Sequence, residues 1–286
     1  MVHGEKKAEK PLMIVTPNPE QVVRAQTDKR FAEILNRADI AIPDGIGLVW
    51  AMRLLNGKQK VERIPGVELM EDLVLMAVKR GYPIACIGGR GGAAGAALSC
   101  LQRRYPGLAG WAEEPDNTTN SKYYQYYQSS NTINGAYDPY LREIAQKILK
   151  TTTRLVFVGL GAPKQEYFIE KLTMSLRDRS DREAISQNDM RSPRSVASGD
   201  LPRDDKGRGV VLMSVGGAFD MIAGRIPRAP YVVRSMGLEW LWRLVREPWR
   251  WRRQRALLKF IWLVIYDGMY AKSFRSEASA RVRNHS

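Results

Sequence analysis

The stretch Ala38–Gly57, "ADIAIPDGIGLVWAMRLLNG", decides the fold class. Ala38–Pro43 has the short apolar pattern of a buried strand, and an apolar helix is predicted to begin near Gly47. Asp44 stands between them. Because parallel α/β sheets bind ligands beyond the carboxyl ends of their strands, a carboxylate in this place is a candidate for chemistry. The alternative is that Asp44 only caps the following helix through its backbone amides.

The same order of strand, turn and helix recurs along the chain. Apolar runs of strand length occur at Leu12–Val15, Ile40–Ile42, Ile84–Ile87, Leu155–Val158 and Val210–Val215. Helical patterns follow at Pro19–Asn36, Leu48–Leu55, Val67–Arg80, Ala93–Tyr105, Pro139–Lys150 and Lys164–Leu172. This alternation predicts an α/β fold: a mostly parallel, Rossmann-like sheet with helices on both faces.

Changes in composition suggest the domain organisation. We expect a flexible tail at 1–11, an α/β core at 12–224, a basic helical appendage at 225–270 and a second flexible tail at 271–286. Two polar stretches interrupt the core, at about 112–137 and 174–209. The second is predicted to be a disordered insertion. The tyrosines of the first, Tyr123 to Tyr127, fit either a lid or an ordinary solvated loop.

The charge is concentrated near the C-terminus. The chain of 286 residues has a net charge of +15, and the segment from Arg225 onward carries 14 Lys/Arg against 4 Asp/Glu, which is +10. Such a basic region implies phosphates, nucleic acid or an anionic membrane as a partner.

Other residue types exclude several kinds of chemistry. The two histidines, His3 and His285, lie in the tails, which disfavours a Ser-His-Asp triad, a Cys-His pair or a histidine zinc site. Acid–base chemistry must then rest on carboxylates, Tyr, Lys or Arg. The two cysteines, Cys86 and Cys100, give no disulfide framework, and we expect a reducing compartment. No apolar run is long enough for a signal peptide or a spanning helix.

The predicted appendage combines arginine with tryptophan. Leu238, Leu241, Trp242 and Val245 fall on one helical face, Pro248 interrupts, and a second helical stretch begins at Trp249. Four arginines (250, 252, 253 and 255) precede the apolar run Phe260–Ile265. The pattern favours a helix lying in the lipid headgroup layer. The alternatives are a surface helix that packs its Trp face on the domain, and nucleic-acid binding.

Three further turns follow predicted strands. They are "VTPNPEQV" with Thr16 and Asn18, "CIGGRGGAAGAAL" with Gly88 and Gly89, and "FVGLGAPKQEYF" with Gly161, Lys164 and Gln165. Asn18 could be a simple helix cap, and the glycines could admit a phosphate to backbone amides. The chain lacks a GxGxxG pattern and any Asp-x-Asp pair, so neither a dinucleotide site nor a carboxylate-held metal is supported.

Taken in order, seven motifs identify a resemblance. "TPNPE", "DGIGLVWA", "RIPGVEL", "IGGRGG", "GLGAPKQE", "VGGAFDMIAGRIPRAP" and "GLEWLWRLVREPWRWRR" are similar to motifs of the bacterial WecG/TagA/CpsF glycosyltransferases, over about residues 12–255 apart from the polar insertions. The departures lie after Leu172 and around "GLAGWAEEPDNTTN".

The resemblance implies an inverting, metal-independent transferase without a cofactor. It would move an N-acetylmannosaminyl, hexosyl or uronosyl group from a UDP-sugar to a polyprenyl-diphosphate-linked acceptor in bacterial cell-surface polysaccharide synthesis. The implied location is cytoplasmic and peripheral on the inner face of the cell membrane, at an anionic surface. Nucleic acid is not an implied partner, and a homo-oligomer stays open.

The resemblance also implies roles for particular residues. Asp44 is the implied general base, and three residues are implied to line its pocket: Thr16, Asn18 and Gln165. The donor nucleotide-sugar site is implied at Arg63, Gly66, Gly88, Gly89, Gly161 and Lys164. Four arginines are candidates for contacting the diphosphate or the membrane, without a choice among them: Arg228, Arg234, Arg243 and Arg246.

Two rival functions come from other classes. A nucleotide-binding oxidoreductase would need a GxGxxG turn and an acidic ribose ligand about 20 residues further on, and neither is evident. A noncatalytic membrane or nucleic-acid adaptor would use the basic tail but would leave Asp44 unexplained.

Overall fold

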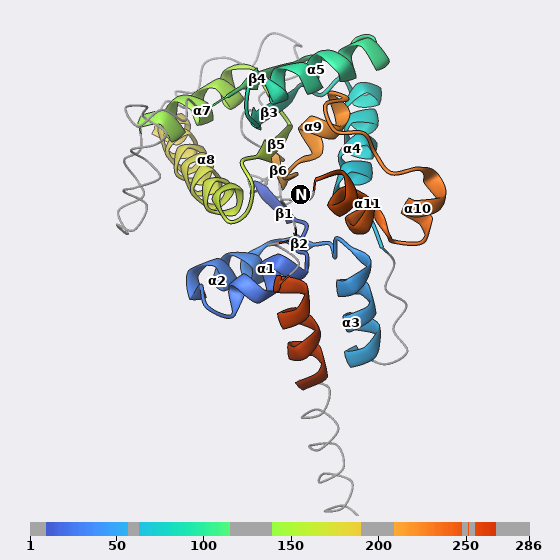
Figure 1. Ribbon diagram of the computed structural model, residues 1–286. Helices are drawn as coiled ribbons and strands as arrows, with labels where there is room; N and C mark the ends of the chain where they lie inside the picture. Colours follow the sequence, from blue (N-terminus) through green and yellow to red (C-terminus); the bar gives the residue numbers. More distant parts are fainter. Residues whose placement is uncertain are drawn as a thin grey trace, which may run out of the picture. The chain divides into compact units, whose positions relative to one another are not determined.

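The sheet is the centre of the architecture (Figure 1). The structure, a computed structural model, describes residues 10–56, 63–114, 139–189, 209–247, 251 and 255–266. Its six parallel strands run in the order β2-β1-β6-β5-β3-β4. They are β1 (Leu12–Val15), β2 (Ile40–Ala41), β3 (Ile84–Gly88), β4 (Gly110–Glu113), β5 (Leu155–Gly159) and β6 (Val211–Ser214). The predicted α/β class with a parallel, Rossmann-like sheet is confirmed.

Helices alternate with these strands along the chain. They are α1 (Pro19–Ala25), α2 (Lys29–Arg37), α3 (Ile46–Asn56), α4 (Gly66–Arg80), α5 (Ala93–Arg104), α7 (Pro139–Lys150), α8 (Lys164–Asp189), α9 (Ala218–Ile222), α10 (Tyr231–Ser235) and α11 (Glu239–Arg246). Residues 255–266 are also helical. Helix α8 packs on β1, β5 and β6, while α5 packs on β3, β4 and α9.

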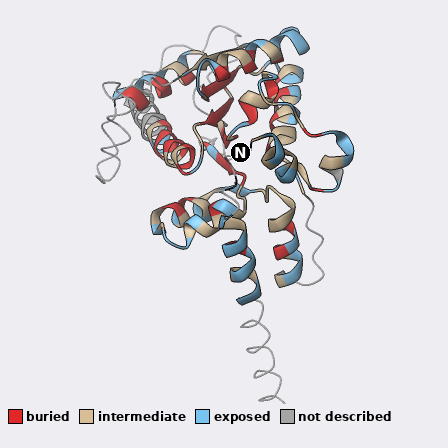
Figure 2. Cartoon of the chain, viewed as in Figure 1, coloured by how far each residue is buried: buried red, intermediate tan, exposed pale blue. Residues whose placement is uncertain are grey.

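The core is built on the two neighbouring interior strands β3 and β5. Their sequences, IACIG and LVFVG, are buried at every position, as expected of strands that are covered on both faces (Figure 2). Phe157, Phe168 and Phe219 are among the largest side chains that are fully buried. The sheet therefore supplies a rigid base for the turns that follow its strands.

The chain divides into two compact units, each discontinuous in sequence. Unit 1 contains Met1–Val15, Arg37–Ile40 and Leu69–Ile226, and unit 2 contains Thr16–Asn36, Ala41–Glu68 and Pro227–Ser286. Unit 2 thus joins the segment after β1 and the segment after β2 to the C-terminal helices. The predicted partition into a core at 12–224 and an appendage at 225–270 stays a prediction.

Two strand predictions are wrong. Ile40–Ile42 was expected to be a buried strand, but β2 ends at Ala41 and both of its residues are exposed, because β2 lies at the edge of the sheet. Strand β4 was missed, since its sequence GWAE lacks an aliphatic run. It overlaps the start of the polar stretch 112–137, whose residues 115–138, with Tyr123 to Tyr127, lie outside the described residues.

Two helix predictions are also wrong. Pro19–Asn36 is two helices rather than one, because Asp28 Oδ1 accepts a hydrogen bond of 3.1 Å from the Phe31 amide and starts α2 anew. Helix α8 continues to Asp189, so residues 174–189 are not the disordered insertion that we expected. Leu176, in the part of α8 beyond Leu172, is fully buried and packs this part of the helix on the core. Residues 190–208 lie outside the described part of the chain.

Helix α11 lies within the first C-terminal helical stretch that the sequence predicts, and residues 255–266 lie within the second, whose predicted start at Trp249 falls outside the described residues. Two residues of the predicted apolar face of α11 are exposed. Leu241 is 40% exposed and Val245 is 71% exposed. Helix α11 therefore does not bury the predicted apolar face as an ordinary surface helix would. Of the predicted tails, only residues 10 and 11 fall within the described residues.

Candidate active site

Asp44 lies three residues beyond the end of β2, in unit 2. Its backbone amide donates to the Pro17 carbonyl at 2.8 Å, and Gly45 behind it has a φ of 94°. Burial raises the pKa of the half-buried carboxyl from 3.8 to about 6. Arg63, the Gly45 amide and Arg243 lower this pKa, whereas Glu239 raises it. A carboxylate with such a pKa holds protons more strongly than a surface aspartate does and suits a general base near neutral pH.

Arg63 is fixed by the C-terminal helices of the same unit. Its Nη2 lies 3.4 Å from Glu239 Oε2, and both side chains are less than one-fifth exposed. Its Nη1 donates a hydrogen bond of 2.8 Å to the Arg234 carbonyl. These two bonds join Arg63 to residues that lie 171 and 176 positions further along the chain. The guanidinium beside Asp44 is therefore positioned from the far end of the chain.

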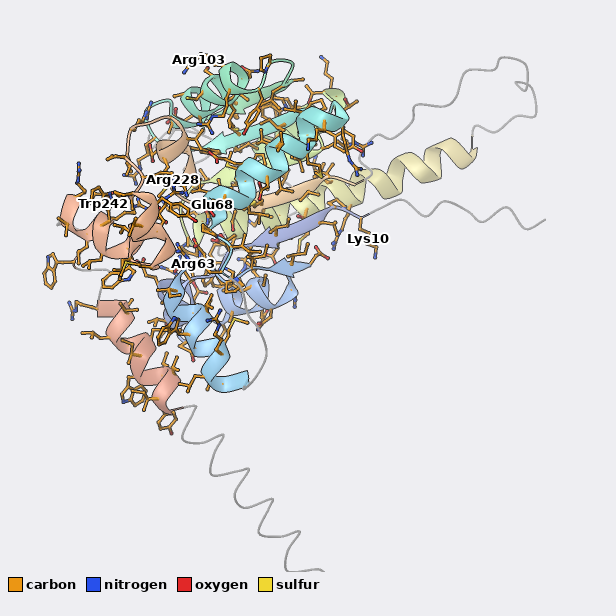
Figure 3. The ribbon with its side chains drawn as sticks, turned by 90° about the vertical axis from the view of Figure 1, so that its right-hand side faces the viewer. Lys10, Arg63, Glu68, Arg103, Arg228 and Trp242 are labelled. Atoms are coloured by element: carbon orange, nitrogen blue, oxygen red, sulfur yellow. The ribbon has the colours of Figure 1, made fainter. Side chains whose placement is uncertain are left out.

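Glu68 holds two more arginines. Its Oε1 accepts from Arg228 Nη2 at 3.0 Å and from Arg234 Nη1 at 3.2 Å. Glu68 lies in the first turn of α4, where a carboxylate is favoured by the helix dipole. Figure 3 shows Glu68 and Arg228 close to each other, with Arg63 and Trp242 labelled nearby.

Four arginines of this cluster keep a donor that no partner uses. Within the described residues, the buried Nε atoms of Arg63, Arg228, Arg234 and Arg243 have no hydrogen-bond partner. The same holds for the indole Nε1 of Trp242. Buried N–H groups are almost always paired in folded proteins, so several unpaired donors in one unit mark a candidate place for an anionic ligand.

Arg246 differs from the other three candidate arginines. Its guanidinium lies 4.8 Å from the centre of the Trp242 ring, and the residue is exposed. Arg243, in contrast, is only 21% exposed and lies 3.6 Å from Glu247. Arg228, Arg234 and Arg243 are thus brought together with Arg63, while Arg246 lies on the outside of α11.

Thr16, Asn18 and Gly66 belong to unit 2 as well. Thr16 is 8% exposed, and Gly66 lies against it: a Cβ on Gly66 would be 3.5 Å from Thr16 Oγ1, an ordinary van der Waals contact. Asn18 forms a capping box: its Oδ1 accepts from the Gln21 amide at 3.1 Å, and its own amide donates to Gln21 Oε1 at 3.2 Å. Its capping role, the alternative that the sequence left open, is confirmed.

The glycines of unit 1 are required by packing. A Cβ on Gly88 would lie 2.9 Å from the Gly159 carbonyl carbon, and one on Gly89 would lie 2.7 Å from Ala93 Cβ. The Gly89 amide donates to the Gly159 carbonyl at 2.9 Å. Gly161 has a φ of 76° with open space where a Cβ would lie. Lys164 is the first residue of α8.

Gln165 is held tightly in unit 1. It is 3% exposed, its Nε2 donates to Glu166 Oε1 at 2.8 Å, and its Oε1 accepts from the Gly216 amide at 3.1 Å. Both ends of the amide are therefore engaged in joining the start of α8 to the turn after β6. Of the candidate residues, Gly88, Gly89, Gly161, Lys164 and Gln165 belong to unit 1, and all others belong to unit 2.

Sequence reasoning missed four residues that organise these sites. Glu68 and Glu239 fix the arginines, and Trp242 contributes an unpaired donor. Arg225 donates from Nη1 to the Arg90 carbonyl at 2.9 Å and from Nη2 to the Gly91 carbonyl at 2.6 Å, and so clasps the turn after β3. The signal for the two glutamates was their place inside the quoted "RIPGVEL" and "GLEWLW" motifs.

No group of three or more His, Cys, Asp or Glu side chains in the described residues could hold a metal ion. None of the helices in this part of the chain has the length and apolar character needed to cross a membrane.

A parallel α/β sheet, with a carboxylate of raised pKa among partly buried arginines, is typical of enzymes that act on phosphate-bearing substrates. The chain belongs to the Glycosyl transferase WecG/TagA/CpsF family, whose pattern matches residues 2–180 and 203–273. The resemblance inferred from the motifs is therefore confirmed, and the protein is a glycosyltransferase.

Two relatives show how far the similarity extends. The N-acetylglucosaminyldiphosphoundecaprenol N-acetyl-beta-D-mannosaminyltransferase of Bacillus spizizenii (strain ATCC 23059 / NRRL B-14472 / W23) is 29% identical over 255 residues, which cover 88% of this chain and 78% of the relative. The protein of the same name from Bacillus subtilis (strain 168) is 26% identical over 262 residues, covering 92% and 82%.

Proposed function

We propose that this protein transfers a sugar with inversion from a UDP-sugar to a polyprenyl-diphosphate-linked acceptor, without a metal ion. The transferred group is N-acetylmannosaminyl or a related hexosyl or uronosyl group, in the synthesis of a bacterial cell-surface polysaccharide. The observation that carries the proposal is a single carboxylate, Asp44, whose pKa is raised to about 6 beside arginines that keep buried, unpaired Nε donors. The two relatives, named as transferases to a diphosphoundecaprenol-linked acceptor, support it.

Asp44 is the proposed general base. Its carboxylate accepts the proton of the acceptor hydroxyl while that oxygen attacks the anomeric carbon of the donor sugar. The bond from this carbon to the UDP oxygen breaks with its electron pair on the leaving diphosphate. One displacement inverts the anomeric configuration, and one base is sufficient for it.

The arginines are the proposed partners of the leaving group. Arg63, Arg228, Arg234 and Arg243 bring positive charge and buried N–H donors, which stabilise a diphosphate best in a site with little water. Glu68 and Glu239 hold three of these arginines in place before the substrate arrives. A fixed set of guanidinium groups supplies the charge that a divalent cation supplies in other transferases.

The remaining candidates keep supporting roles in the proposal. Thr16, Asn18 and Gly66 shape the pocket of unit 2, and Asn18 does so through the start of α1. The turns of unit 1 at Gly88, Gly89 and Gly161 are assigned to the nucleotide-sugar, together with Lys164. Gln165 is proposed to act through the turn at Gly216, which it fixes within unit 1.

The proposed place of action is the inner face of the cell membrane. There the lipid of the acceptor is buried and its diphosphate lies in the headgroup layer. The basic C-terminal helices, with Arg246 on their exposed side, are assigned to this anionic surface. A homo-oligomer stays compatible with the exposed apolar side chains of the same helices.

A panel of UDP-sugars with a short-chain prenyl-diphosphate-linked N-acetylglucosamine tests the proposal. We expect one donor to give a product heavier by one sugar, an inverted anomeric configuration by NMR, and unchanged turnover with EDTA. Failure of every UDP-sugar, with tight binding of NAD or of duplex DNA instead, would contradict it in favour of an oxidoreductase or an adaptor.

A further inference from the structure

Helix α3 exposes large apolar side chains to solvent. Its sequence IGLVWAMRLLN is apolar on most faces, but only Val49 and Ala51 are buried, at 1% and 5% exposure. Trp50 is 67% exposed and Leu54 is 66% exposed. Residues four apart lie on the same side of a helix, so the two form one apolar face that points to solvent.

The helix at 255–266 exposes a second apolar face next to the first. Phe260 is 4% exposed, and it and Leu257 lie within 4.0 Å of where a Gly47 Cβ would be, which places this helix against α3. Both helices belong to unit 2 and lie side by side in Figure 1. The exposed apolar and aromatic residues on the second helix are Leu258, Ile261, Trp262, Ile265 and Tyr266, with exposures from 40% to 71%.

The exposed apolar residues of the second helix have the spacing of a helix face that packs against a partner. Positions 258, 261, 262 and 265 follow the i, i+3, i+4, i+7 pattern that normally faces a core. Trp262 and Tyr266 stack with ring centres 5.2 Å apart at an angle of 17°. Contiguous apolar patches of this kind are uncommon on surfaces that meet only water.

Charge identifies the occupant of the two faces. The sequence from Gly45 to Val61 has three Lys/Arg and no acid, and that from Pro248 to Tyr266 has five and no acid. Two copies of so cationic a surface would repel each other. The segment after Tyr266 is also basic, with four Lys/Arg against two Asp/Glu. Apolar and aromatic side chains flanked only by cations fit the boundary between anionic headgroups and acyl chains.

We propose that α3 and the helix at 255–266 together form one lipid-docking surface, in which Trp50 and Leu54 enter an anionic bilayer beside the C-terminal helix. The inference rests on the proposed function only for the reason why such docking is useful, namely a lipid-linked acceptor. The proposed surface thus includes a helix, α3, that lies about 200 residues before the basic C-terminal segment in the sequence.

The test uses the full chain and vesicles of phosphatidylglycerol with phosphatidylcholine. The double variant Trp50→Ser/Leu54→Ser is expected to lower the vesicle partition coefficient at least about tenfold, because two large apolar side chains no longer enter the bilayer. Met174→Ser is the matched control, since Met174 is 53% exposed but belongs to α8 of unit 1. It is expected to leave partitioning unchanged.

A second readout guards against a double variant that folds poorly. Acyl-chain-brominated lipids quench tryptophan fluorescence on contact. Trp50→Phe, which keeps the apolar surface, is expected to bind vesicles as the wild type does while losing part of the quenching. Equal quenching in the two proteins would show that Trp50 stays outside the bilayer.

The outcomes separate this inference from the proposed function. Turnover of a water-soluble short-chain acceptor is expected to be the same in the double variant and the wild type. If the wild type lacks this turnover, the proposed function fails and the vesicle result still stands. Unchanged partitioning of the double variant overturns the docking surface. The same holds if the double variant binds vesicles as the wild type does but loses self-association in sedimentation, because the face would then join two copies of the chain.

Discussion

The polar groups of the two units are treated in opposite ways. In unit 1, both ends of the Gln165 side-chain amide are hydrogen-bonded to protein groups, and a Cβ at Gly88 or Gly89 would clash with neighbouring atoms. In unit 2, Arg63 and Arg228 keep buried Nε donors without partners in the described residues, and partial burial raises the pKa of Asp44. Satisfied polar groups stabilise a fold, while unsatisfied ones wait for a ligand. We therefore place the proposed base and its arginines in unit 2, whereas the turns of unit 1 that are proposed to bind the nucleotide-sugar are fixed by packing and hydrogen bonds.

Replacement of the proposed base has the largest expected effect. Asp44→Asn keeps the shape of the side chain but cannot accept the proton, and kcat is expected to fall about 10²- to 10⁴-fold with the fold intact. Turnover of the short-chain acceptor measures it. Asp28→Asn is the matched control in the same unit, because asparagine caps a helix as well as aspartate does. Wild-type turnover in Asp44→Asn would remove Asp44 from the mechanism.

The scaffold role of unit 1 predicts a stability effect. A Cβ on Gly159 would lie 2.7 Å from the buried Phe219 ring, so Gly159→Ala is expected to lower the free energy of unfolding by roughly 3 kcal/mol. Gly161→Ala adds a Cβ into open space and is expected to cost only the left-handed backbone strain, about 1 kcal/mol. Urea unfolding compares them. Equal losses would mean that packing does not define this turn.

Asp44 also predicts a stability that depends on pH. Its folded pKa, about 6, lies above the ordinary value of 3.8, so the ionised carboxylate destabilises the fold above pH 6. Asp44→Asn is therefore expected to stabilise the protein at pH 7.5 by at most about 3 kcal/mol, from a difference of 2.2 pKa units.

The stabilisation by Asp44→Asn should shrink as the pH falls through 6 toward 3.8, because Asp44 then becomes neutral in both the folded and the unfolded protein. Urea unfolding at several pH values follows the gain. A variant that is less stable than the wild type at pH 7.5 would show that the carboxylate supports the fold instead.

The arginines are expected to separate into two groups. Arg228→Gln leaves Glu68 with one partner and removes a buried donor, so kcat/KM for the donor is expected to fall about 10- to 100-fold. Arg246→Gln removes an exposed guanidinium that stacks on Trp242 and is expected to change kcat/KM for a short-chain acceptor less than twofold. Equal losses at the two positions would end the distinction between a buried cluster and an outer face.

The sequence was sufficient for four of the six strands and for the position of Asp44 just after a strand, and the reasons are local. Aliphatic runs of strand length predicted β1, β3, β5 and β6, and a carboxylate just after a strand is visible without a structure. The partners of Asp44 were not predictable in the same way. Arg63 meets Glu239 across 176 residues, and Glu68 meets Arg228 across 160. Pairings at such separations depend on the tertiary fold, and so does the partner of an edge strand such as β4.

The pH dependence of kcat/KM tests the central claim most directly, because its acidic limb reports the base of the free enzyme. For the wild type, the limb is expected at an apparent pKa of about 6. Glu239 raises the pKa of Asp44, so Glu239→Gln is expected to move the limb to lower pH. A wild-type profile that is flat between pH 5 and 7, or a limb that Glu239→Gln leaves in place, would contradict Asp44 as the base.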